Sequence, residues 1–116
     1  MARKTIPFSA NKAAIQAEYE RLKALFEGAP EKQLQLADKE LQRAAFLAVT
    51  LDILEDDISK NGYTEEYQNG ANQRGRKKTP AADLHVSFTK NYVTIMKQLH
   101  ATLLDEEPDL DDFDRF

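Results

Sequence analysis

The feature that most constrains this chain is residues 30–60, where apolar side chains recur at helical spacing with no Gly or Pro after Pro30. Spacings of three, four and seven residues place these side chains on one helical stripe: Leu34, Leu41, Ala45, Ala48, Leu51, Leu54 and Ile58. Pro30 suits the start of a helix, and Asn61-Gly62 suits its end. A helix over 30–60 would be about 45 Å long. That is too long for a compact monomer of this size, so we expect it to pack along another helix or another subunit.

Two further helices are predicted on either side of this one. The first spans residues 10–27, with Ser9 as N-cap and Gly28 as the stop; its stripe is Ile15, Tyr19, Leu22 and Phe26. The last spans residues 80–104 and starts at Thr79-Pro80, an N-cap followed by a first-turn proline. Its stripe is Leu84, Phe88, Tyr92, Ile95 or Met96, Leu99 and Leu103.

The residues between and after these helices are polar. Segment 61–79 contains two Asn-Gly steps and Gly75, which mark turns; a short β-hairpin and a flexible loop both fit it. The predicted fold is therefore all-α. It is a long antiparallel helical hairpin plus one N-terminal helix, with an irregular basic tip and an acidic C-terminal tail. Residues 1–104 form one helical domain, and residues 105–116 form a flexible tail.

Composition excludes several classes of protein. The 116 residues include no Cys, so disulfides, thiolate metal sites and a cysteine nucleophile are excluded. No apolar run approaches the roughly 20 residues that a membrane-spanning helix needs, so no membrane partner is expected. Residues after Met1-Ala2-Arg3-Lys4 lack the apolar stretch of a signal peptide.

A search for catalytic residues leaves little. His85 and His100 are fifteen positions apart on one predicted helix, about 20 Å, too far to share a metal ion. Asp52 and Asp56 share a helix face and could hold Mg²⁺ with the help of a second subunit, but a solvated helix face is the simpler interpretation. No phosphate-binding or nucleophile motif occurs. We expect no enzyme activity, no cofactor and no resident metal.

The sharpest local feature is the basic run Arg74-Gly75-Arg76-Lys77-Lys78, in the predicted tip. Arg and Lys supply phosphate contacts, and the amides nearby can reach base edges. The candidate DNA-binding residues are Arg3, Lys4, Lys12, Arg74, Arg76, Lys77 and Lys78. The alternative is a loop kept soluble by charge. A helix-turn-helix is excluded, because no short helix follows a tight turn here.

The tail has its own charge pattern. Residues 105–116 carry seven acidic residues against one base, so a net charge of −4 conceals a body of about +2. The tail either keeps the chain soluble or docks on a basic, apolar groove of a partner protein, or it covers the basic tip of its own or a neighbouring subunit. Its candidate partner-binding residues are Leu110, Phe113 and Phe116.

The stretch from Leu41 to Leu104 resembles the small subunits of tailed-bacteriophage terminases that have a central helical hairpin. The resemblance rests on an ordered set of features: Leu51-Asp52-Ile53-Leu54-Glu55-Asp56-Asp57-Ile58 with Asn61-Gly62; the turn Tyr67-Gln68-Asn69-Gly70; Gln73-Arg74-Gly75-Arg76-Lys77-Lys78-Thr79-Pro80; and a returning helix with Phe88, Tyr92, Ile95, Met96 and Leu99. It covers a little over half of the chain.

The resemblance implies a non-enzymatic subunit for packaging viral DNA in the cytoplasm of an infected bacterial host. Family members form homo-oligomeric rings, bind double-stranded DNA and regulate the terminase large subunit, which carries the ATPase and nuclease. Many also carry an N-terminal helix-turn-helix, for which the first 30 residues have no room. A protein-binding helical adaptor or assembly factor without DNA binding remains an alternative, and a helical transcriptional regulator is a third.

Overall fold

A computed structural model describes residues 8–68, 70 and 73–104 of the chain, with side chains from residue 11 onward. Its elements in order are the helices α1 (Phe8–Leu25), α2 (Glu31–Leu36) and α3 (Asp38–Asn61), the strands β1 (Thr64–Gln68) and β2 (Arg74–Lys78), and the helix α4 (Pro80–Leu104). The described part of the chain is thus mostly helical, as predicted, with one small two-stranded sheet. The segment between the last two helices, expected to be an irregular tip or a short β-hairpin, forms paired strands.

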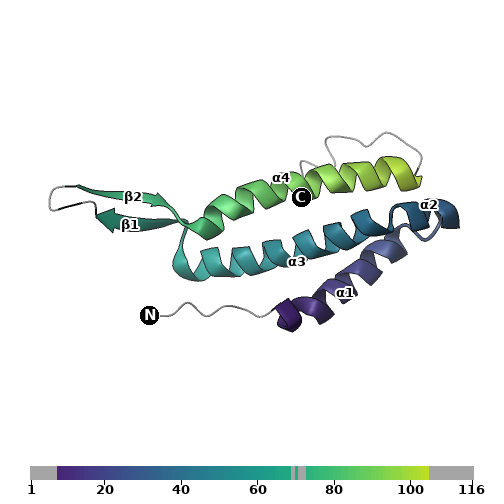
Figure 1. The fold of residues 1–116 in the computed structure, drawn as a ribbon, viewed down its shortest axis with the longest axis horizontal. Coiled ribbons are helices and arrows are strands. Elements are labelled where there is room, and N and C mark those ends of the chain that lie inside the picture. The colour runs from purple at the N-terminus through teal and green to yellow at the C-terminus, as the bar shows by residue number, and fades with distance from the viewer. Residues whose placement is uncertain (1–7, 69, 71–72, 105–116) are drawn as a thin grey trace.

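The molecule is elongated, measuring 63 × 33 × 19 Å. α3 and α4 lie side by side, and the two strands extend beyond them at one end of the long axis (Figure 1). α1 packs on α3, and α2 lies at the end of the molecule opposite the strands (Figure 1). The strands are therefore held away from the helical body.

The hydrophobic core occupies the end of the molecule remote from the strands. There α1 contributes Leu22, the turn that follows α1 contributes Phe26, α3 contributes Leu41, and α4 contributes Leu99 and Leu103, all buried. Small residues of α3 sit between these larger side chains and allow the helices to approach closely: Ala44 and Ala45. Burying one such leucine stabilises the fold by roughly 2 kcal/mol, so this end anchors the three long helices.

The single helix predicted over 30–60 is divided at Ala37. This residue has φ −90° and ψ 2°, away from helical values, and it separates α2 from α3. Backbone hydrogen bonds continue from Ala37 N–H to the Gln33 carbonyl and from Leu41 N–H to the Ala37 carbonyl. Leu34, Ala37 and Leu41 are all buried in one core. The helical spacing of apolar residues therefore continues across the break, and the sequence gives no sign of it. α3 alone, with 24 residues, is about 36 Å long.

The ends of α1 also differ from the prediction. The helix begins at Phe8, so Ser9 lies within its first turn and is not the N-cap. It ends at Leu25, three residues before Gly28. Tighter turns follow, in which Phe26 N–H donates to the Lys23 carbonyl and Ala29 N–H to the Phe26 carbonyl. Such turns commonly close a helix, and here they lead the buried Phe26 into the core.

The junctions on either side of the strands follow the predicted signals. α3 stops at Asn61, and Gly62 has φ +85°, a conformation that side-chain-bearing residues rarely adopt. The Thr79 hydroxyl accepts a hydrogen bond from Ala82 N–H at 3.2 Å, and Pro80 is the first residue of α4. These two devices fix where the helices end and the strands begin.

Candidate nucleic-acid interface and adjacent groove

The basic run lies on a two-stranded antiparallel ribbon, here called the ribbon (residues 64–68 and 74–78). Its register pairs Thr64 with Lys78, Glu66 with Arg76, and Gln68 with Arg74. A further hydrogen bond from Thr79 N–H to the Tyr63 carbonyl, at 2.9 Å, continues the pairing toward the helices. The structure therefore brings the predicted residues Arg74, Arg76, Lys77 and Lys78 together on one strand.

Two cross-strand ion pairs connect the ribbon's charged side chains. Arg76 lies 3.8 Å from Glu66, and Lys77 lies 3.7 Å from Glu65. Both pairs are largely exposed, and pairs of this kind contribute less than about 1 kcal/mol. Within the described ranges, Arg74 and Lys78 form no ion pair. The basic side chains are thus accessible to an anionic partner, which would replace only weak contacts.

One aromatic side chain packs on the ribbon. Tyr67 stands opposite Gly75, and its ring lies so close that a Cβ on Gly75 would come within 2.7 Å of the Tyr67 hydroxyl oxygen. A glycine in a strand weakens it, and an aromatic ring laid across the gap restores packing. Gly75 therefore provides the space for the Tyr67 ring. The sequence had indicated a turn at Gly75, but this residue lies within β2.

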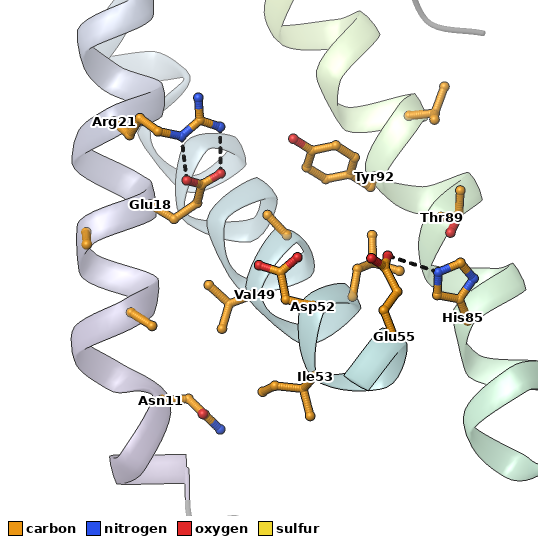
Figure 2. Close-up of a pocket in the computed structure, with 15 residues that line it drawn as sticks. Asn11, Glu18, Arg21, Val49, Asp52, Ile53, Glu55, His85, Thr89 and Tyr92 are labelled. Atoms are coloured by element: carbon orange, nitrogen blue, oxygen red, sulfur yellow. Dashed lines mark hydrogen bonds and ion pairs between the residues drawn. The ribbon is translucent and has the colours of Figure 1, made fainter. Parts of the chain in front are cut away.

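A second candidate surface is a groove of about 1020 Å³ between α1, α3 and α4 (Figure 2). Much of its lining is small or apolar and includes Ala14, Ala17, Ala48, Val49 and Ile53. It is called here the α1–α3–α4 groove. The sequence did not predict this groove. The apolar stripes show which face each helix buries, but they do not show where α1 and α4 are too far apart to be in contact. The signal available was the small-residue content of α1, which permits close approach.

Polar side chains border this groove. Arg21 donates to both carboxylate oxygens of Glu18, at 2.6 and 2.8 Å, and His85 of α4 lies 3.1 Å from Glu55 of α3 (Figure 2). Tyr92 projects into the same space, and burial, followed by the nearby Glu18 carboxylate, raises the pKa of its hydroxyl. The groove is thus an apolar channel with a charged border, a composition suited to another protein surface.

Two of the residues considered for metal binding have partners within the chain. His85 pairs with Glu55, and Asp56 pairs with Lys60 at 2.9 Å. Asp52 borders the groove, without a hydrogen bond or ion pair to any other described residue. No group of three potential ligands that could hold a metal ion occurs in the described ranges. In the same ranges, no helix has the length and apolar character to cross a membrane.

The remaining predicted residues are not brought to the ribbon. Lys12 is exposed on α1, which starts beneath α3 and apart from the ribbon (Figure 1). Arg3 and Lys4 lie outside the described residues, as do Leu110, Phe113 and Phe116. The structure thus gathers four of the predicted bases on one strand. DNA binding by these bases and the arm, and partner binding by the tail, stay predictions.

Comparisons of this chain with protein-family models, with curated proteins and with solved structures found no match.

Proposed function

We propose that this chain is a non-enzymatic DNA-packaging subunit of the terminase small-subunit class. In this proposal it assembles into a homo-oligomeric ring through its long antiparallel helical hairpin. It binds viral double-stranded DNA and regulates the ATPase and nuclease of a terminase large subunit in the cytoplasm of an infected bacterium. The observation that carries the proposal is the ribbon, which presents four basic residues beyond the end of two long helices.

Charge and position support DNA as the ligand. The ribbon carries four bases and two acids, and it projects beyond the described helices, where a rod-like polyanion can approach it (Figure 1). Phosphate contacts of this kind give sequence-independent affinity that falls steeply with salt. They fit a subunit that must hold DNA while a motor acts on it.

Uncovered apolar surface supports assembly. The α1–α3–α4 groove is open within the part of the chain that the structure describes. On the other side of the α3–α4 pair, a hollow of about 290 Å³ lies beside Phe46, which is 39% exposed. Two different apolar faces on one subunit favour head-to-tail contacts between subunits. Such contacts form a ring when the rotation from each subunit to the next closes on itself.

The DNA-binding part of the proposal is tested by replacing Arg74, Arg76, Lys77 and Lys78 together with Ala. The affinity for duplex DNA, measured by fluorescence anisotropy, should fall, and its dependence on salt should flatten. Unchanged affinity and slope would remove the ribbon from the DNA site.

The regulatory part is tested with the large subunit of the same virus. Its ATP hydrolysis rate should rise with the wild-type chain and rise less with the fourfold variant.

A protein-binding helical adaptor is the second candidate, and the α1–α3–α4 groove is the observation that favours it. An adaptor of this kind would show no DNA binding even at low salt. Deletion of residues 105–116 would abolish its binding to a partner if the tail is the ligand. Retention of salt-dependent DNA binding by the full chain decides against this candidate.

A further inference from the structure

The strand register separates the four bases of the ribbon onto two faces. Directly opposed residues of an antiparallel pair share a face, and neighbours along a strand alternate. One face therefore carries Thr64, Glu66 and Gln68 opposite Lys78, Arg76 and Arg74. The other carries Glu65 and Tyr67 opposite Lys77 and Gly75. The side-chain contacts agree, because the Arg76 guanidinium donates to the Thr64 hydroxyl at 3.3 Å, across the first face.

The two faces differ in charge. The first face has three bases and one acid, a net charge of +2, and is called here the basic face. The second has Lys77 against Glu65, which form an ion pair, and is called the tyrosine face. All of the ribbon's net positive charge is therefore on one side, although the sequence shows four bases in five residues.

The tyrosine face is also occupied. The Tyr67 ring lies against Gly75, the position between Arg74 and Arg76 on β2. Gly75 has no side chain to offer to a ligand, and the ring covers its backbone. Lys77 is the single base of this face, and its nearest acid is the directly opposed Glu65. An anionic surface would find few contacts there.

We propose that the ribbon binds duplex DNA face-on, through Arg74, Arg76 and Lys78 of the basic face, and that Lys77 on the tyrosine face takes no part. This inference rests on the proposed function, DNA binding by the ribbon. The DNA major groove, about 12 Å wide, admits a two-stranded ribbon. Face-on docking turns one face of the ribbon toward the base edges and leaves the other in solvent.

The side chains of the basic face suit this arrangement. Its bases occupy alternate positions of β2, about 7 Å apart along the strand. Gln68, the cross-strand partner of Arg74, adds an amide that can pair with an adenine edge, while Arg74 can pair with guanine. Arg76 gives up only exposed contacts on binding, the ion pair with Glu66 and the hydrogen bond to the Thr64 hydroxyl. The opposite arrangement, entry of the ribbon tip first, would place both faces against phosphate walls and would make Lys77 equivalent to its neighbours.

The test compares four single variants, Arg74→Gln, Arg76→Gln, Lys78→Gln and the matched control Lys77→Gln. Each removes one charge from the same exposed strand and keeps a long side chain. Arg76→Gln and Lys77→Gln are the closest pair, because each also releases one cross-strand glutamate. Affinity of the full-length chain for a short duplex is measured at several salt concentrations. Log affinity falls as log salt rises, and each basic-face variant should make this negative slope shallower by about 0.9. Lys77→Gln should leave the slope unchanged.

If Lys77→Gln makes the salt dependence of DNA affinity shallower by as much as Arg76→Gln does, the face-on proposal is overturned, because both faces would then contact DNA. If the wild-type chain shows no salt-dependent duplex binding, the proposed function fails first, and the two failures are distinguishable. Binding of the wild-type ribbon to a peptide of residues 105–116, with no affinity for DNA, would likewise overturn the proposal in favour of an acidic protein partner. Circular dichroism melting of all four variants checks that the fold is retained.

Discussion

Tyr19 and Asp38 connect α1 to α3, outside both candidate surfaces. The Tyr19 hydroxyl donates a hydrogen bond to the Asp38 carboxylate, which also accepts one from the Gln42 amide at 2.7 Å. The bond to Asp38, with burial as the next cause, raises the pKa of Tyr19 to about 12. Folding therefore favours the protonated tyrosine, whose ordinary pKa is about 10. Its stabilising contribution is complete below about pH 10 and is lost as the pH rises through about 12.

This pair gives a prediction for Tyr19→Phe. Loss of a partly exposed hydrogen bond to a charged group should lower the free energy of unfolding by about 1 kcal/mol at pH 7. The gap between wild type and variant should close between about pH 10 and 12, as followed by urea unfolding at each pH. Tyr63→Phe is the control, because Tyr63 is 70% exposed and its hydroxyl bonds to no described residue. A gap that stays constant up to pH 12 would contradict the role given to Tyr19.

Among the elements, the junction from α3 into the ribbon depends on Gly62. Its φ of +85° and ψ of 172° lie in a region that is almost restricted to glycine. Gly62→Ala should therefore lower the free energy of unfolding by about 2 kcal/mol, although the nearest atom to the new Cβ would be 3.9 Å away. Gly28→Ala is the matched control, with open space around its Cβ and no positive φ. It should leave stability unchanged or raise it by up to about 1 kcal/mol. Equal melting curves for the two variants would refute this account.

The same element shows what the sequence could predict. Asn61-Gly62 and Thr79-Pro80 marked both ends of the ribbon segment correctly, because each signal acts through local backbone chemistry. The sequence does not decide whether the residues between these ends pair, because the two strands, TEEYQ and RGRKK, lack the alternation of apolar and polar residues that marks a half-buried strand. The division of the bases into two faces required the register, and the register depends on contacts between strands.

The break at Ala37 and the α1–α3–α4 groove escaped prediction for a related reason. Both depend on how helices meet in space, whereas the apolar period depends only on which side of each helix is buried. Leu84 illustrates the difference, because it continues the stripe of α4 yet is 46% exposed near the ribbon. The core residues at the other end, such as Leu22 and Leu99, were predicted correctly, since all the helices converge there.

On the scale of the whole molecule, the α1–α3–α4 groove should be covered when subunits assemble. Ala17 lines the groove from α1, whereas Ala13 is exposed on the same helix outside it. Ala17→Glu would place a charge in a buried contact and should weaken assembly by more than about tenfold. Ala13→Glu should leave assembly unchanged. Analytical ultracentrifugation over a range of concentrations measures both, and equal behaviour of the two variants would exclude the groove as a contact between subunits.

The central claim is that copies of this chain assemble through their helices and bind duplex DNA through their ribbons, and native mass spectrometry tests it most directly. Full-length protein is measured alone and after addition of a short duplex. We predict a single closed assembly with a whole-number multiple of the chain mass, which gains the mass of the duplex at low salt and loses it when Arg74, Arg76 and Lys78 are replaced by Gln. A monomer at every concentration, with no duplex bound at low salt, would contradict the account.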